Sequence, residues 1–315
     1  MKFNNMGGIT METGILLESG TNELEILEFR VGNNYYGINV AKIKEIVPYK
    51  EPTPIPNSHP YIEGIFMPRD QIISIIDLEK SLNVMRRPGD TTKTDMYIVT
   101  NFNKLNTAFH VHGVLGIHRV SWADIATPDA TINSESTSVA TGIIRLENKL
   151  IVILDFEKIV SDISPETGLK SSDIEKMGTR GRNNSPILIA EDSPLLGKLI
   201  FNCLFKAGYN NIIMNGNGLE AWNKLCEYRN SGKLDEKVAC VITDIEMPQM
   251  DGHRLTKLIK EDPHMCHLPV VIFSSLVNEE MRRKGEALGA DAQLSKPEIG
   301  TLVEAIDKLV GNEQE

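Results

Sequence analysis

The N-terminal half of the chain alternates hydrophobic and polar residues with a period of two, the pattern of a strand with one buried face. The alternation runs through residues 27–31, pauses at a Gly-Asn-Asn turn and resumes through residues 36–40. This pattern predicts a β-hairpin. Residues 96–99 and 108–111 flank an Asn-rich segment in the same way and predict a second hairpin.

The same half also contains an internal repeat. A Gly-Ile pair, an apolar run and an Asp-x-Glu-Lys ending occupy residues 64–80, and the same features recur over residues 142–158. The offset is 78 residues at both the start and the end of the pattern. Chance rarely keeps both ends in register, so the repeat predicts two copies of one β unit, each closing with a short helix.

From residue 186 onward, short apolar runs alternate with segments whose apolar residues recur at helical spacing. The expected strands cover residues 187–190, 212–214, 238–243, 270–273 and 293–295. Ser193 and Pro194 supply an N-cap and a first-turn proline for the first helix of this half. Five strands joined by crossover helices predict a doubly wound parallel sheet, whose ligand crevice lies beyond the carboxyl ends of the strands.

Four of these expected strands end in polar or charged pairs. The pairs are Glu191-Asp192, Thr243-Asp244, Ser274-Ser275 and Lys296-Pro297. Three carboxylates at one sheet edge repel one another unless a cation joins them, and a set of oxygen ligands suits Mg²⁺. We expect Asp192 and Asp244 to bind the metal directly, Glu191 to act through a metal-bound water, and the backbone carbonyl of Glu246 to complete the shell.

The same edge has the parts that phosphoryl transfer requires. A carboxylate nucleophile attacks phosphorus while positive groups neutralise the charge on the other phosphoryl oxygens. We assign Asp244 as the nucleophile, Lys296 as the partner of one phosphoryl oxygen and the Ser274 hydroxyl as the donor to another. Taken singly, Lys296 and Ser274 are ordinary surface and loop residues. Their joint placement at strand ends favours the functional interpretation.

These residues carry a family resemblance. The run from Thr243 to Gly252 resembles the phosphorylation loop of two-component receiver domains, and with the flanking residues in order the resemblance covers residues 186–315. It implies a flavodoxin-like fold with a five-stranded parallel sheet, and a cis peptide before Pro297. The chain departs from the family in two places: the first acid is Glu191 where Asp is more usual, and Gln293 stands where many receivers carry a switching Tyr or Phe.

The N-terminal half resembles CheW, the protein that couples chemoreceptors to their histidine kinase. The matching segments are residues 36–40, 62–65 and 140–143, together with Arg69. The resemblance implies a mostly-β domain of two SH3-like β-barrels without a catalytic centre, in which Arg69 contacts the receptor or the kinase; a plain surface arginine at a strand edge is the alternative. A CheW-like domain before a receiver resembles the CheV family.

Composition narrows the remaining function classes. The formal charge is −10 with a pI near 5.3, which disfavours nucleic acid as a partner. No stretch reaches the ~20 apolar residues needed for membrane insertion. The four cysteines show no CxxC spacing, which favours a reducing cytoplasm. His110 and His112 have no acidic or cysteine neighbours and are interpreted as structural, and the His264–His267 segment as a polar loop.

We therefore expect four segments: an N-terminal segment 1–23, a CheW-like coupling domain 24–160, a linker 161–185 and a receiver domain 186–315. The expected function is that of a cytoplasmic adaptor, not an enzyme, at chemoreceptor arrays. It would couple methyl-accepting chemotaxis proteins to the kinase CheA under control of Asp244 phosphorylation, with later self-dephosphorylation. The alternative is a phosphate sink that drains the kinase, with the coupling domain as a tether only.

Overall fold

The chain divides into two compact units in the computed structural model, and each is described by itself. The first consists mainly of residues 24–120 and 126–164, and the second mainly of residues 180–311. The structure describes residues 22–86, 92–102, 105–126, 128, 139–146, 149–164, 180–276, 279–296 and 298–311. The segment before residue 22, residues 165–179 of the expected linker and the peptide at Pro297 lie outside the described residues.

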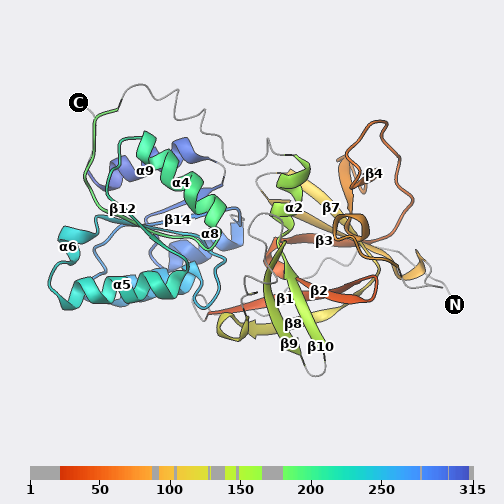
Figure 1. Ribbon diagram of the computed structural model, residues 1–315, viewed down its shortest axis with the longest axis horizontal. Coiled ribbons are helices and arrows are strands. Elements are labelled where there is room, and N and C mark those ends of the chain that lie inside the picture. The colour runs from red at the N-terminus through yellow and green to blue at the C-terminus, as the bar shows by residue number, and fades with distance from the viewer. Residues whose placement is uncertain are drawn as a thin grey trace. The chain divides into compact units, whose positions relative to one another are not determined.

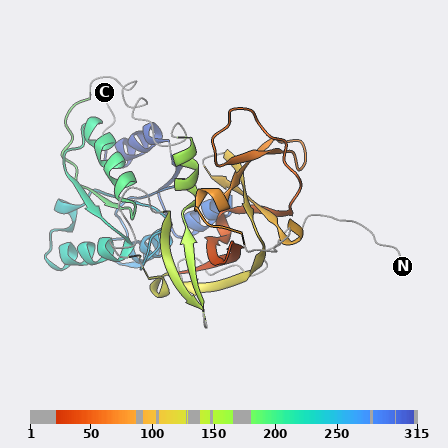
Figure 2. The same ribbon diagram turned by 45° about the vertical axis from the view of Figure 1, so that its right-hand side comes forward.

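In the described residues, the first unit contains two mixed sheets of five strands, in which the hairpins have the same spatial arrangement. The first sheet has the order β8-β1-β2-β10-β9, with β1 (Glu23–Val31), β2 (Asn34–Asn39), β8 (Val114–Ser121), β9 (Ala140–Leu146) and β10 (Lys149–Leu154). The second has the order β3-β6-β7-β5-β4, with β3 (Ile43–Pro48), β4 (Ile62–Phe66), β5 (Ile73–Asp77), β6 (Met96–Phe102) and β7 (Leu105–Val111). Each sheet joins two hairpins through one parallel pair, β2 with β10 and β7 with β5. The paired yellow-green arrows of β9 and β10 show one such hairpin in Figure 2.

The internal repeat of the sequence is a structural repeat. The helix α1 (Leu78–Ser81) follows β5, and α2 (Phe156–Ile163) follows β10. The Asp77 side chain caps α1 by accepting from the Lys80 N–H at 3.1 Å, and Asp155 caps α2 by accepting from the Lys158 N–H at 3.0 Å. Aspartate at this position satisfies backbone donors that a helix start leaves without a partner. The predicted pair of β units with closing helices is confirmed.

One hydrophobic core joins the two sheets of the first unit. Its large side chains include Phe29 of β1, Phe109 of β7 and Phe156 of α2, all fully buried. The rings of Phe109 and Phe156 lie 4.0 Å apart between centroids, so the second helix packs directly on the second sheet. Burying a side chain of this size contributes about 1.5–3 kcal/mol. The apolar residues of the alternating pattern therefore form the inner face of both sheets.

The second unit is built on a parallel sheet with the order β12-β11-β13-β14-β15. Its strands are β11 (Ile187–Ala190), β12 (Ile212–Asn215), β13 (Cys240–Thr243), β14 (Val270–Ser274) and β15 (Ala292–Ser295). Its helices are α4 (Pro194–Lys206), α5 (Gly218–Asn230), α6 (Leu234–Lys237), α7 (Gly252–Glu261), α8 (Glu279–Ala287) and α9 (Ile299–Leu309). The helices α4 and α9 cover one face of the sheet, and α5 covers the other (Figure 1). The predicted α/β architecture is confirmed.

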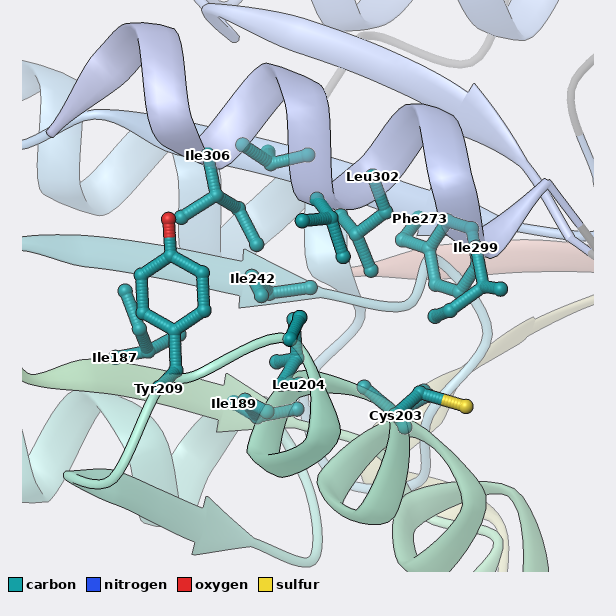
Figure 3. Packing of buried hydrophobic residues seen from close by; sticks show 14 of the residues in the cluster. Ile187, Ile189, Cys203, Leu204, Tyr209, Ile242, Phe273, Ile299, Leu302 and Ile306 are labelled. Carbon is teal, nitrogen blue, oxygen red and sulfur yellow. The ribbon is translucent and has the colours of Figure 1, made fainter. Parts of the chain in front are cut away.

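The run of apolar residues in β11 is continuous because the strand is buried on both faces. Ile187 and Ile189 pack with α4 and α9, whereas Leu188 and Ala190 pack on the opposite face with α5 and α7. Figure 3 shows Ile187 and Ile189 beneath the side chains of α9, with Leu204 of α4 beside them. A strand buried on both faces has no place for a polar residue until it ends. The polar chemistry is therefore confined to the end of the strand.

Two local features differ from the sequence prediction or extend it. The third strand begins at Cys240 rather than Val238, because the Val238 N–H donates to Leu234 and closes α6. A four-residue helix is too short to show a helical period, so the pattern could not indicate it. Residues 180–185 lie along the second unit, where Asn183 pairs with Tyr209 and Arg180 bonds Asp307. Within the described residues, no helix has the length and hydropathy needed to span a membrane.

Candidate functional site

The parallel register of the sheet brings the predicted residues to one edge. Ala190 lies opposite Thr243, and Ser274 lies opposite Ser295. The next residue of each strand therefore leaves the sheet at the same end. The structure places Glu191, Asp244 and Lys296 there, each less than one tenth exposed.

Lys296 lies between two carboxylates at this edge. Its Nζ is 2.7 Å from Glu191 Oε2 and 2.7 Å from Asp244 Oδ2. Burial raises the pKa of Glu191 to about 7, although the positive charge of Lys296 acts in the opposite direction. Burial by itself lowers the pKa of Lys296, but Asp244 and Glu191 outweigh it and the pKa is raised. The ammonium group is therefore held in its charged form between its two partners.

The acids at this edge form a candidate metal site. Carboxylate oxygens of Glu191, Asp192 and Asp244 lie within 4.8 Å of one another, and this is the one such group found in the described residues. Asp192 is partly exposed, which leaves one side of the cluster open to an ion and its water. Receiver domains typically bind Mg²⁺, and a donor set of oxygens alone fits this ion. A bound Mg²⁺ supplies positive charge beside the oxygens of an incoming phosphoryl group.

Binding of Mg²⁺ is expected to tighten about tenfold between pH 6 and pH 8, because a metal requires ionised carboxylates and the pKa of Glu191 is raised to about 7. Titration calorimetry at pH 6, 7 and 8 measures this dependence. In the Glu191→Gln variant the pH dependence should flatten. An unchanged pH dependence in that variant would assign the titration to another group.

The loop after β13 fixes the orientation of Asp244. The Ile245 N–H donates to Asp244 Oδ1 at 2.6 Å, and the Gly252 N–H closes the loop on the Ile245 carbonyl at 2.9 Å. Asp251 then caps α7 by accepting from the Arg254 N–H at 2.7 Å, and burial raises the pKa of Asp251 to about 6. Position 252 admits only glycine, because a Cβ there would lie 1.8 Å from the Asp244 carbonyl oxygen.

The sequence interpretation missed Asp251 and Gly252 as supports of this loop. The signal was present, since an Asp immediately before a segment with helical spacing is an N-cap signature. It also missed the ion pair of Glu191 with Lys296, for which no sequence signal exists. A contact between the ends of two strands depends on side-chain length and on the register of the sheet, and neither can be read from the sequence.

The other predicted residues of this edge lie close by. The Ser274 hydroxyl is buried and accepts from the Leu276 N–H at 3.2 Å, and the Lys296 N–H donates to the Ser274 carbonyl at 3.1 Å. Glu246 is partly exposed in the loop after Asp244. Gln293 is buried, and its Nε2 donates to the Arg282 carbonyl of α8 at 2.7 Å. The position of the family's aromatic residue is thus occupied by an amide that bonds a helix.

Arg69 lies in the first unit, in the connection between β4 and β5. Its side chain is 69% exposed, and its Nη2 is 3.2 Å from Glu45 Oε2. Met67 and Ile72 in the same connection are 64% and 65% exposed. An exposed arginine between two exposed apolar side chains is a composition typical of a protein-binding surface.

The histidines differ partly from the sequence interpretation. His110 and His112 do have acidic partners, namely Glu63 and Asp95 for the first and Glu79 for the second. The expectation of no acidic neighbours was wrong because these partners lie far away in the sequence. In the loop before β14, His267 pairs with Asp235 and Cys266 is exposed. Among the described residues, no cluster of metal-ligating side chains lies in this loop.

Each half of the chain matches a known protein family. The family described as "CheW-like domain" matches residues 25–164, and "Response regulator receiver domain" matches residues 187–307. The chemotaxis protein CheV3 of Helicobacter pylori is 32% identical over 301 residues, which cover 91% of this chain and 95% of that protein. The chain belongs to the CheV family. CheV2 of the same organism is 30% identical over 309 residues, covering 92% of this chain and 95% of that protein.

The CheV architecture makes the chain a chemotaxis coupling adaptor with a phosphorylatable receiver domain, rather than a member of a known catalytic family. The predicted family and fold class are confirmed. Among solved structures, the scaffolding protein CheW from Thermoanaerobacter tengcongensis is similar to the first half. It is 26% identical, covers 42% of this chain and 83% of its own, and has a TM-score of 0.38.

Proposed function

We propose that phosphorylation of Asp244 regulates how this adaptor couples methyl-accepting chemotaxis receptors to the histidine kinase CheA, in the cytoplasm at receptor arrays. The observation that carries the proposal is the contact of Lys296 with both Asp244 and Glu191 at a sheet edge that also holds Asp192. A buried lysine between carboxylates is a group that a phosphoryl oxygen can displace from one partner. Arg69, on the exposed connection of the first unit, is proposed to contact the receptor or the kinase.

The proposed chemistry is a transfer of a phosphoryl group from nitrogen to oxygen. A carboxylate oxygen of Asp244 forms a bond to phosphorus as the P–N bond of the kinase phosphohistidine breaks, and the imidazole leaves with the electron pair of that bond. Asp192 and Asp244 would hold Mg²⁺ directly, with Glu191 through a water and the Glu246 carbonyl completing the shell. Lys296 would pair with one phosphoryl oxygen, and the Ser274 hydroxyl would donate to another. Water then attacks the acyl phosphate and releases inorganic phosphate.

The new charge explains how the site would signal. An aspartyl phosphate carries roughly −1.5 to −2 charge units where the carboxylate carried one. Recruitment of Ser274 and Lys296 towards this charge would reshape the ends of β14 and β15, both of which contact the phosphoryl site. A coupling free energy of ~1–3 kcal/mol is sufficient to change the docking affinity by a factor between several-fold and about a hundredfold.

Reconstitution with receptor and kinase tests this proposal. Addition of a small phosphodonor should change kinase activity in arrays that contain the wild-type adaptor, whereas arrays with Asp244→Ala should give the same activity with and without donor. Both proteins should support coupling before donor is added, since the substitution leaves the CheW-like domain intact. Equal responses of the two proteins to the donor would overturn the proposal. Rapid turnover of phosphate at Asp244 without any change in coupling would also contradict it, because the site would then act as a phosphate sink.

A further inference from the structure

A buried histidine in the CheW-like domain lies between two carboxylates. His110 of β7 places Nδ1 at 2.8 Å from Glu63 Oε2 and Nε2 at 3.0 Å from Asp95 Oδ2. The His110 side chain is 10% exposed and the Asp95 side chain is fully buried. Glu63 comes from β4, and Asp95 immediately precedes β6. One imidazole ring thus contacts acids from two other parts of the second sheet.

The geometry determines the charge of His110. An ionised carboxylate only accepts hydrogen bonds, so both ring nitrogens must donate, and only the imidazolium has two N–H groups. The Arg86 guanidinium donates to both carboxylate oxygens of Asp95, at 3.2 and 2.6 Å. Burial by itself lowers the pKa of His110, but the contacts with Glu63 and Asp95 outweigh it and the pKa is raised above 6.5.

His112, the next histidine along the chain, lies just after the end of β7 and is neutral. His112 Nδ1 accepts from the Gly32 N–H at 2.9 Å, so this nitrogen carries no proton. Its Nε2 faces Glu79 Oε2 at 3.0 Å and holds the single ring proton. Burial and then the charge of Arg86 lower the pKa of His112. The centroids of the two rings are 6.1 Å apart, so a charged histidine on β7 and a neutral histidine just after it lie side by side.

The contact between His110 and Glu63 crosses one strand of the second sheet. The strand order β7-β5-β4 puts one strand between His110 and Glu63, and β4 is the edge strand. Glu63 is the extra residue of a β-bulge, because Ile62 pairs with Ile76 and Gly64 with Ile75. A bulge re-aims a side chain that would otherwise follow the alternation of its strand. Here it directs the carboxylate over β5 to the imidazole, and the strand that it fixes leads directly into the connection that carries Arg69.

We propose that protonated His110 is a pH-dependent clasp, which holds the bulged edge strand β4 on the second sheet and releases Glu63 when His110 loses its proton. The groups that face His110 are Glu63 of β4, Asp95 before β6 and the rings of Tyr49 and Tyr97, at 4.8 and 5.4 Å. His112 follows the end of β7, and Arg86 lies beyond Asp95. Burial raises the pKa of both tyrosines, so these phenols stay neutral while His110 titrates.

The direction of the pKa shift of His110 determines how the stability of the clasp changes with pH. A histidine whose pKa is raised on folding contributes its full stabilisation below the unfolded value, near pH 6.5, and loses it as the pH rises through the folded value. The ratio of open to closed β4 should therefore increase about tenfold for each unit by which the clasp raises the pKa. The CheW-like domain alone carries this behaviour, so it holds whether or not Asp244 is phosphorylated.

Nitrogen NMR of the full chain with ¹⁵N-labelled histidine tests the charge assignment. At pH 6, both ring nitrogens of His110 should show imidazolium shifts, and the ring should titrate above pH 6.5. His112 should show one protonated and one unprotonated nitrogen from pH 7 to pH 8, and should titrate below pH 6.5. An unprotonated nitrogen on His110 at pH 6, or titration of the ring at or below pH 6.5, would overturn the proposal.

Hydrogen exchange of the β4 amides tests the clasp itself. After correction for the intrinsic exchange rate, opening of Ile62–Phe66 should increase with pH across the titration of His110 in the wild type. Glu63→Gln should give a flat profile, because an amide can bond either form of the ring. The matched control Glu45→Gln removes another carboxylate of the same sheet and should keep the wild-type profile. A flat wild-type profile, or the same slope in Glu63→Gln as in the wild type, would contradict the clasp.

Discussion

Replacement of Lys296 by methionine is expected to destabilise the receiver domain by about 3–5 kcal/mol at neutral pH in the absence of divalent metal. The substitution keeps the length of the side chain and removes the charge between Glu191 and Asp244, whose side chains are only 2% and 10% exposed. Two buried carboxylates would then repel each other without a counter-ion. Urea unfolding followed by Trp222 fluorescence, in a Trp122→Phe background, measures the loss.

Three comparisons separate this electrostatic effect from a packing defect. Addition of Mg²⁺ should restore much of the lost stability, because the ion replaces the missing positive charge. A second substitution, Asp244→Asn, should also restore it by removing one of the repelling charges. Lys224→Met removes a lysine from an exposed pair with Glu227 and should change the free energy of unfolding far less than Lys296→Met does. Equal losses for the variants at positions 296 and 224 would contradict the buried role of Lys296.

Substitution of Gly252 by alanine is expected to cost about 3 kcal/mol or more of receiver stability, at or above the upper end of the range for overpacking. The added Cβ would lie 1.8 Å from the Asp244 carbonyl oxygen and 3.0 Å from Thr243 Oγ1. The carbonyl is backbone and cannot rotate away, so the loop that orients Asp244 must move. Labelling of Asp244 by a small phosphodonor should slow in parallel.

The matched control for this variant is Gly181→Ala in the same unit. A Cβ at position 181 meets no atom within 4 Å, so its effect on the free energy of unfolding should stay within about 0.5 kcal/mol. The same fluorescence assay compares the two variants directly. A Gly252→Ala protein as stable as Gly181→Ala would show that the loop after β13 tolerates a side chain at this position.

Lys296 and Gly252 can both be read from the sequence, but their contacts cannot. Hydrophobic periodicity determined the five strands of the receiver, since four-residue runs such as Ile187–Ala190 are buried on both faces and end where polarity begins. The constant offset of the internal repeat determined the paired β units and the two capping aspartates, Asp77 and Asp155. These features depend on local propensity and on burial, which are properties of short segments. For the same reason, the order of acids, hydroxyl and lysine at strand ends was sufficient to indicate the candidate site.

Only the tertiary structure decided which of these groups touch one another. The Glu191–Lys296 pair depends on side chains long enough to meet from two separate strand ends, and the three acids around His110 and His112 come from a strand, a helix and a loop. Such contacts between residues distant in sequence are set by register, by a bulge and by side-chain length, none of which a linear pattern encodes. The sequence by itself determined the architecture and the inventory of the site, whereas the charge state of each buried group was decided by the partners that folding brought to it.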